Sequence, residues 1–299
     1  MSEFRCGYVS LIGRPNVGKS TLLNALIGEK VAIVSPKPQT TRNRIAGIKN
    51  LPEAQIVFLD TPGIHKPRHK LGERMVREAS GTFHDVDVVL FLVEPGEPTA
   101  GDRAILESIA GFRKPVFLII NKVDTIKKHE LLPVIDVYAK LYSFREIIPL
   151  SALKGDGLGH LLEALLALLP TGPRLYPDDI LTDQAERFMA AEAIREKIMQ
   201  QTDDELPYSI AVEVLTWKEK KDGLVAIQAN IYVERDSQKG IIIGKHGARL
   251  KEIGTAARAD IERLLGARVF LELWVKVRKD WRNDDRALKD LGFESCRYK

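Results

Sequence analysis

The chain of 299 residues is long enough for two domains, and its 44% hydrophobic and 29% charged residues are typical of a globular protein rather than a disordered one. No apolar run approaches the roughly 20 residues that cross a bilayer, and the N-terminus leads directly into a strand-like run, so we expect a cytoplasmic protein without a signal peptide. A net charge of +4 does not by itself indicate nucleic-acid binding, and Cys6 and Cys296 have no spacing typical of a disulfide framework or zinc site.

Apolar runs alternate with helix-like segments up to about residue 170. The predicted strands are 7–12, 55–59, 86–93, 116–120 and 146–150. The predicted helices are 19–27, 100–111, 131–142 and 158–169. This order predicts an α/β domain at 1–170, with a mostly parallel sheet, helices on both faces and a ligand at the carboxyl ends of the strands.

A linker is predicted at 171–181, where prolines and a glycine interrupt regular structure. The elements predicted after it are a helix at 183–200, strands at 209–217 and 224–233, a pair of helices within 238–265, and a strand at 268–277. The order αββααβ predicts a smaller α+β domain at 182–282, followed by a tail at 283–299.

The first motif lies between a predicted strand and a predicted helix and fits GxxxxGK[ST]. Its backbone N–H groups are expected to contact phosphates, with Lys19 reaching the β- and γ-phosphates and Ser20 binding Mg²⁺. We assign to this part of the nucleotide site the residues Gly13, Arg14, Pro15, Asn16, Val17, Gly18, Lys19, Ser20 and Thr21.

Three further motifs follow successive predicted strands and together indicate GTP and GDP as ligands. Asp60 can hold Mg²⁺ through water, the Gly63 N–H can contact the γ-phosphate, and Asp124 can accept from two N–H groups of guanine, which adenine lacks. The assigned residues are Asp60, Thr61, Pro62, Gly63 and Ile64, then Asn121, Lys122, Val123 and Asp124, and finally Ser151, Ala152 and Leu153, where backbone N–H groups can reach the guanine oxygen.

The polar, proline-containing segment 35–43 is predicted to order around the γ-phosphate, with Thr41 completing the Mg²⁺ shell and Thr40 as the alternative. Ile64 stands where many GTPases carry a glutamine that orients water, so slow intrinsic hydrolysis is expected. A K⁺ ion held by Asn16 is a second hypothesis for hydrolysis. The predicted catalytic residues are thus Asn16, Lys19, Thr41 and Gly63, and the predicted metal ligands are Ser20, Thr41 and Asp60.

A second glycine pair, at Gly244 and Gly247, encloses only two residues and lacks the Lys-Ser that handles a triphosphate. A GxxG loop between two helices of an αββααβ unit is the KH arrangement, which holds about four single-stranded nucleotides. A simple helix-turn-helix corner is the alternative. The predicted RNA-binding residues are Lys239, Ile243, Gly244, Lys245, His246, Gly247, Arg249, Lys251, Lys276 and Arg278.

Over nearly its whole length the chain resembles the bacterial Era family, through GRPNVGKS, QTTR, DTPGI, NKVD and SALKG followed by IIIGKHGARLKEIG and LELWVKVRKDWR. The resemblance implies a Ras-like P-loop GTPase domain followed by a type II KH domain. It also implies a GTP-hydrolysing switch that binds the 3′ end of 16S ribosomal RNA, assists 30S subunit assembly and associates peripherally with the membrane.

We further expect a monomer in which GTP and Mg²⁺ change how the KH domain sits across the linker. Two alternatives remain. One is a signalling or membrane-associated GTPase switch whose C-terminal domain binds protein. The other is an RNA-modifying enzyme with a GTPase module, although residues 181–299 show no nucleophile or metal constellation.

Overall fold

The computed structural model describes residues 4–64, 67, 69–81, 86–202 and 206–293. These form two compact units. The first comprises Met1–Ala32, Thr41–Pro67 and Met75–Asp183, and the second comprises Ile33–Thr40, Arg68–Arg74 and Gln184–Lys299. Two short segments from the first third of the chain therefore group with the C-terminal unit, which a division at the linker does not anticipate.

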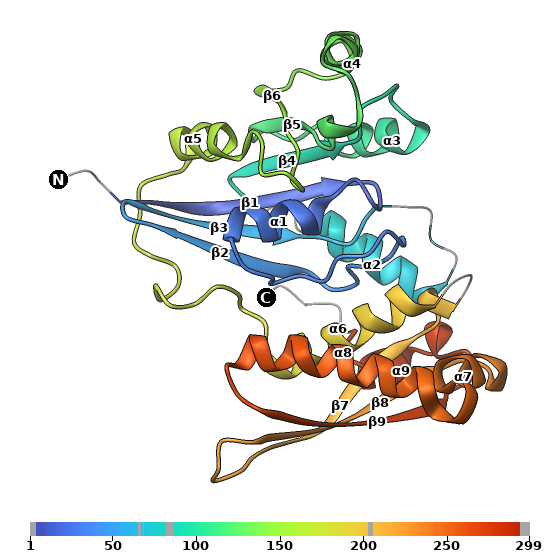
Figure 1. Cartoon of the computed structure of the whole chain (residues 1–299). Helices are drawn as coiled ribbons and strands as arrows, with labels where there is room; N and C mark the ends of the chain where they lie inside the picture. The colour runs from blue at the N-terminus through green and yellow to red at the C-terminus, as the bar shows by residue number, and fades with distance from the viewer. Residues whose placement is uncertain (1–3, 65–66, 68, 82–85, 203–205, 294–299) are drawn as a thin grey trace. The chain divides into compact units, whose positions relative to one another are not determined.

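The first unit is built on a six-stranded sheet in the order β2-β3-β1-β4-β5-β6 (Figure 1). Its strands are β1 (Arg5–Gly13), β2 (Ile45–Leu51), β3 (Ala54–Asp60), β4 (Val88–Val93), β5 (Val116–Ile120) and β6 (Glu146–Pro149). All neighbours pair in parallel except β2, which pairs antiparallel with β3. β3, β4 and β5 are buried along their whole length, as expected for central strands of a sheet covered on both faces.

The helices of this part of the chain are α1 (Lys19–Ile27), α2 (Lys70–Gly81), α3 (Ala100–Ser108), α4 (Leu131–Ala139) and α5 (Leu158–Leu168). α1 begins after Gly18 and ends at Gly28, both in the left-handed conformation that glycine adopts without strain. α3 begins with a capping box between Thr99 and Asp102. α3 and α4 contribute to one core cluster with strand residues such as Phe91. The carboxyl ends of β1, β3 and β5 lead into the predicted nucleotide motifs.

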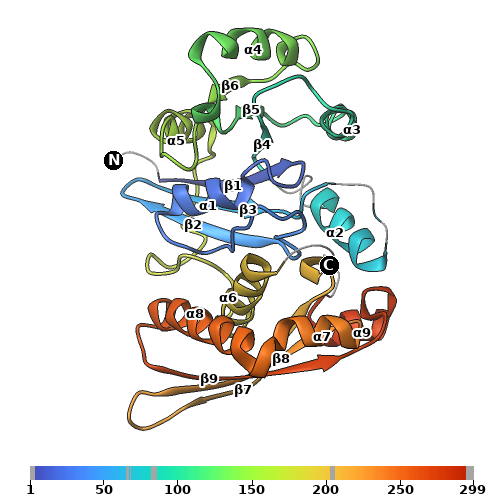
Figure 2. The ribbon, with the colours of Figure 1, turned by 45° about the vertical axis from the view of Figure 1, so that its right-hand side comes forward.

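The second unit contains α6 (Glu186–Gln201), β7 (Ala211–Glu219), β8 (Val225–Val233), α7 (Asp236–Ile243), α8 (Ala248–Leu265), β9 (Val269–Val277) and α9 (Asp285–Asp290). The predicted order αββααβ is confirmed. β8 is central, antiparallel to β7 and parallel to β9, and α6, α7 and α8 pack on one face of the sheet through a shared core (Figure 2). Phe270 and Trp274, which alternate with the inward residues of β9, stay 55% and 38% exposed.

Ordered structure continues across the boundary predicted between the KH domain and the tail at residue 283. Trp281 is fully buried, and its indole N–H donates to the Ser209 carbonyl at 2.9 Å. The short helix α9 follows, and residues 294–299, including Cys296, lie outside the described residues.

Candidate functional site

The phosphate loop packs closely against two of the other nucleotide motifs. A Cβ on Gly18 would lie 2.2 Å from the Asn121 amide nitrogen, and one on Gly63 would lie 2.7 Å from the Pro15 backbone nitrogen. Asn16 is held at φ 67°, a left-handed conformation uncommon outside glycine. Backbone strain of this kind concentrates at binding sites. The close packing at positions 18 and 63 leaves no room for a side chain larger than that of glycine.

Lys19 is buried beneath this loop. Its ammonium group donates to the carbonyls of Gly13 at 3.1 Å and Arg14 at 3.0 Å. Burial lowers the pKa of Lys19 to about 8, although the negative charge of Asp60 acts in the opposite direction. A phosphate at this point would add a second negative charge to that of Asp60 and so stabilise the buried ammonium.

Three oxygen-bearing side chains meet beside Lys19. The Ser20 hydroxyl donates to Asp60 Oδ2 at 2.6 Å, the Thr41 hydroxyl donates to the same oxygen at 3.1 Å, and the two hydroxyls are 2.8 Å apart. Asp60 is fully buried, and its Oδ1 has no hydrogen-bond partner among the residues that the structure describes. Burial raises the pKa of Asp60 despite the opposing effects of Lys19, Ser20 and Thr41. Hard oxygen ligands with an unpartnered carboxylate oxygen fit Mg²⁺. Thr40 differs, because its hydroxyl donates to the Lys37 carbonyl at 2.6 Å.

The predicted guanine motifs are tied to the phosphate loop by Asn121. Its amide donates to the Val17 carbonyl at 2.8 Å, and its side-chain oxygen accepts from the Ala152 N–H at 2.9 Å. The Asp124 carboxylate accepts a hydrogen bond from the Ser151 hydroxyl at 2.6 Å, which fixes its orientation. Residues that follow β1, β5 and β6 are thus brought into direct contact with one another.

Two basic residues of the predicted set are engaged in ion pairs. The Arg14 guanidinium donates to the buried Asp102 carboxylate at 2.8 Å, and Lys122, itself at φ 64°, pairs with Glu94 and donates to the Asn16 carbonyl at 2.7 Å. Asp102 and Glu94 were not predicted to belong to the site. The Thr-x-x-Asp pattern indicates a helix cap, but no local signal shows that its carboxylate reaches the phosphate loop 88 residues away in sequence.

The remaining residues predicted for the nucleotide site differ in their contacts and in their burial. The Thr61 hydroxyl donates to the Leu11 carbonyl at 2.8 Å, and the Ile64 N–H donates to the Gly13 carbonyl at 3.4 Å. The Ile64 side chain packs against the apolar core and offers no polar atom. Pro62 is buried, Thr21 and Val123 are half-buried, and Leu153 is 75% exposed.

The GxxG loop joins α7 to α8 and exposes Lys245 and His246. His246 adopts φ 52°, another non-glycine residue in the left-handed region. A Cβ on Gly244 would lie 2.8 Å from Arg249 Cβ, whereas one on Gly247 would meet no atom of the described part of the chain within 4 Å. Gly244 therefore allows the loop to pack closely against the start of α8, whereas the space beside Gly247 is open among the described residues.

A groove of about 380 Å³ begins at this loop and runs between α8 and β9. Its lining residues are Gly247, Leu250, Lys251, Gly254, Thr255, Arg258, Leu271, Glu272 and Leu273. Only Gly247 and Lys251 were predicted. The four-residue spacing of Leu250, Gly254 and Arg258 on one helix face is the sequence signal that could have added these three.

Several predicted RNA-binding residues lie outside the lining of this groove. Lys276 alternates with the inward-facing Val275, and Arg278 pairs with Asp290 at 2.8 Å. Ile243 packs against the apolar core, and Lys239 is half-buried in α7. Arg249 donates to the Ile241 carbonyl at 3.0 Å and so closes the end of α7.

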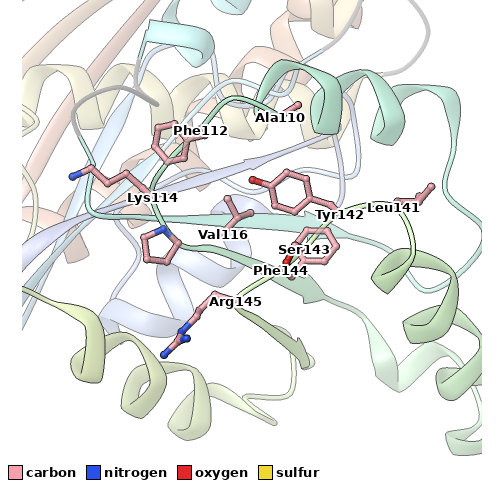
Figure 3. A pocket seen from close by; sticks show the side chains of 10 residues that line it. Ala110, Phe112, Lys114, Val116, Leu141, Tyr142, Ser143, Phe144 and Arg145 are labelled. Atoms are coloured by element: carbon pink, nitrogen blue, oxygen red, sulfur yellow. The ribbon is translucent and has the colours of Figure 1, made fainter.

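A second hollow, of about 700 Å³, lies near the amino ends of β5 and β6 (Figure 3). It is lined by Ala110, Phe112, Lys114, Pro115, Val116, Leu141, Tyr142, Ser143, Phe144 and Arg145. Val116 begins β5, whereas Asn121 follows its opposite end. This hollow therefore does not belong to the nucleotide site.

Two family models match the chain, one described as a 50S ribosome-binding GTPase over residues 8–122 and one as a KH domain over residues 205–282. GTPase Era of Geobacter metallireducens is 59% identical over 98% of this chain and 99% of that protein. GTPase Era of Ruminiclostridium cellulolyticum is 55% identical over 98% and 99%, respectively.

Two solved structures are similar over 97% of this chain and 99% of their own, each at 45% identity. One is a variant of Aquifex aeolicus Era bound to GDP and AlF4⁻, with a TM-score of 0.94. The other is Era in complex with MgGDPNP and nucleotides 1506–1542 of 16S ribosomal RNA, with a TM-score of 0.95. Among the residues that our structure describes, no helix combines the length and apolar character needed to cross a membrane.

Proposed function

The chain belongs to the Era family of GTPases, and we propose that it is a GTP-driven switch that binds the 3′ end of 16S ribosomal RNA and assists assembly of the 30S subunit. The observation that carries this proposal is the presence, in one chain, of a guanine-nucleotide site and of a GxxG loop that opens onto an apolar groove. The related Era complex with MgGDPNP and 16S ribosomal RNA supports it, because that protein is 45% identical to this one.

In the proposed nucleotide site, the N–H groups of the phosphate loop and the buried ammonium of Lys19 bind the phosphates. The Asp124 carboxylate, oriented by Ser151, accepts from two N–H groups of guanine, which an adenine base does not offer. The other predicted nucleotide contacts, from Arg14 to Leu153, stay assigned to this site.

Ser20, Thr41 and Asp60 are the proposed metal residues, with Ser20 and Thr41 as direct ligands and Asp60 acting through water. Bound Mg²⁺ would neutralise charge that develops on the phosphate oxygens. The direct contacts already made among the three side chains place their oxygens within one small region.

We propose that hydrolysis is slow without an activator, because Ile64 offers no hydrogen bond to an attacking water. The chain's own contributions are the Lys19 charge, the Gly63 N–H and the Thr41 hydroxyl. Asn16, exposed at the outer edge of the phosphate loop, is the proposed side-chain ligand of a K⁺ ion.

For RNA, the proposed backbone contact is the GxxG loop, with the exposed Lys245 and His246 beside the phosphates. The groove offers apolar surface from Leu250, Leu271 and Leu273 for bases, and charged groups at its rim. Lys239, Ile243, Arg249, Lys276 and Arg278 remain predicted to contribute along the same path.

A matched pair of glycine substitutions tests the RNA site. Gly247→Asp places a carboxylate at the loop, where it would repel phosphates, and aspartate tolerates the left-handed backbone better than most residues. Gly223→Asp is the control, since Gly223 lies in the β7–β8 turn with φ 76° and a Cβ at that position would meet nothing within 4 Å.

The readout is binding of a single-stranded fragment of the 16S 3′ end, measured at fixed salt. We expect Gly247→Asp to weaken binding at least about tenfold and Gly223→Asp to leave it unchanged. Equal RNA binding by both variants would contradict an RNA site at the GxxG loop, whereas no RNA binding by the unmodified protein would favour a C-terminal unit that recognises protein. A monomeric, cytoplasmic protein with peripheral membrane association is also proposed from the family resemblance, and vesicle flotation tests the last point.

A further inference from the structure

The segment Ile33–Thr40, which ends one residue before Thr41, groups with the C-terminal unit rather than with the phosphate loop that precedes it. Ile33 is 5% exposed and belongs to the same core cluster as Ile194 and Ile198 of α6. An apolar side chain therefore anchors the start of the segment in the core of the KH unit.

Two charged residues of α6 hold the segment near its two ends. Glu196 is 1% exposed, and its carboxylate accepts from the Val34 N–H at 2.9 Å. Arg195 is 2% exposed, and its guanidinium donates to the Thr40 carbonyl. The same guanidinium donates to the Glu192 carboxylate at 2.7 and 2.5 Å, which fixes its orientation.

Burial of two charges is unfavourable unless they are paired and hydrogen-bonded, so these contacts are specific rather than incidental. Between the two contacts, Gln39 adopts φ 61°, a conformation that persists only when its surroundings hold it. The backbone from Val34 to Thr40 is thus fixed at both ends, and the next residue is the proposed Mg²⁺ ligand.

Further contacts join α6 to the helix that follows the GxxG loop in the same unit. α6 packs against α8, the helix that follows the GxxG loop. Lys197 joins them, with its ammonium 3.5 Å from the Glu196 carboxylate and 2.7 Å from that of Asp260 on α8. A path of packed and paired groups within one unit therefore connects the segment to the helix that carries the groove.

We infer that Arg195 and Glu196 are positioning residues for GTP binding and hydrolysis. They hold the segment 33–40 so that the Thr41 hydroxyl can bind Mg²⁺. Binding of Mg²⁺ by Thr41 then affects the KH unit through this segment as well as through the linker at 171–181. The inference rests on the proposed function, because it assigns Mg²⁺ to Thr41 and RNA to the GxxG loop. Since binding linkage is reciprocal, RNA on the KH unit must also change the affinity for GTP and Mg²⁺ through the same contacts.

The test compares Arg195→Met with Arg282→Met. Methionine retains much of the apolar stem of arginine but cannot donate to the Thr40 carbonyl. Arg282 is the control, because it forms a bidentate ion pair with Glu234 at 3.0 and 2.6 Å in the same unit, and its partner belongs neither to the segment nor to α6. Each variant is measured for GDP affinity, the Mg²⁺ concentration that half-saturates GTP hydrolysis, and RNA affinity with GDP or a GTP analogue.

For Arg195→Met we expect the half-saturating Mg²⁺ concentration to rise about tenfold, the change expected from one lost hydrogen bond to a charged group. We also expect GDP affinity and RNA affinity in the GDP state to stay within about twofold, while the effect of the GTP analogue on RNA affinity is lost. Arg282→Met should retain all four properties even where its thermal stability falls. A normal Mg²⁺ response and normal coupling in Arg195→Met would overturn the inference.

A second pair covers the case in which Arg195→Met does not fold. Glu196→Gln keeps an oxygen that can accept from the Val34 N–H, whereas Glu196→Leu does not. We expect Glu196→Gln to retain coupling and Glu196→Leu to lose it, and equal coupling in both would contradict the inference. Failure of the proposed function is distinguishable, because the unmodified protein itself would then show no RNA binding or no difference between nucleotides.

Discussion

The Thr41 hydroxyl donates to Asp60 Oδ2 at 3.1 Å, in the same cluster that contains the Ser20 hydroxyl. Thr40, its neighbour in sequence, turns its hydroxyl to the Lys37 carbonyl at 2.6 Å. Two adjacent threonines thus differ in their hydrogen-bond partners, which allows a direct comparison of their proposed roles.

Thr41→Val should weaken the Mg²⁺-dependent affinity for a GTP analogue about tenfold and slow hydrolysis, because valine keeps the shape but removes the oxygen ligand. GDP affinity should change little. Thr40→Val is the matched control and should behave as the unmodified protein does in titrations with a fluorescent nucleotide. The assignment of Thr41 fails if Thr40→Val shows the larger loss.

Asp124→Asn should change the base preference of the nucleotide site from guanine to xanthine. An amide offers one donor and one acceptor where the carboxylate offers two acceptors, and xanthine carries a carbonyl in place of the guanine amino group. We expect GTP affinity to fall about a hundredfold or more and xanthosine triphosphate to compete better than GTP. Ser151→Ala removes the bond that orients Asp124 and a bond that the hydroxyl accepts from the Lys154 N–H at 3.2 Å, and it should lower GTP affinity without changing the preferred base.

The Lys19 pKa of about 8 predicts proton uptake when GDP binds in the absence of Mg²⁺. Burial lowers this pKa below its ordinary value, and a bound phosphate raises it again, so above about pH 8 the lysine regains a proton on binding. GDP affinity should therefore fall as pH rises through that pKa. Calorimetry at about pH 8.5 in buffers of different ionisation enthalpy measures the uptake. Lys19→Arg, which stays charged, should show none.

Potassium should accelerate GTP hydrolysis relative to sodium if the Asn16 side chain holds the cation. Asn16→Gly is the appropriate variant, because glycine retains the left-handed backbone at φ 67° without strain while the amide is lost. We expect this variant to hydrolyse GTP at one rate in both salts. If the unmodified protein hydrolyses GTP at the same rate in potassium and in sodium, the proposed role of K⁺ is wrong.

The parts of the fold that sequence predicted well are those with an unambiguous local pattern. β4 and β5 are apolar throughout because both faces of the sheet are covered, and they were predicted within two residues. β2 was not predicted, since Gly47, Lys49 and Asn50 interrupt its apolar pattern. Its position depends on tertiary packing instead, as a Cβ on Gly47 would lie 2.6 Å from the Leu23 side chain.

The same distinction applies to the site. The phosphate loop and the GxxG loop could be predicted because backbone geometry fixes the spacing of their glycines. The pairing of Arg14 with Asp102 and of Arg195 with Thr40 joins residues 88 and 155 positions apart. Tertiary packing determines such pairs, so a single sequence carries no local pattern for them.

The measurement that tests the central proposal most directly is the affinity for a fragment of the 16S 3′ end in two nucleotide states at one salt concentration. With Mg²⁺ and a GTP analogue we predict RNA binding about tenfold tighter than with GDP, and RNA should raise the preference of the protein for the analogue over GDP by the same factor. Equal RNA affinity of the GTP-analogue complex and the GDP complex would contradict a GTP-driven switch.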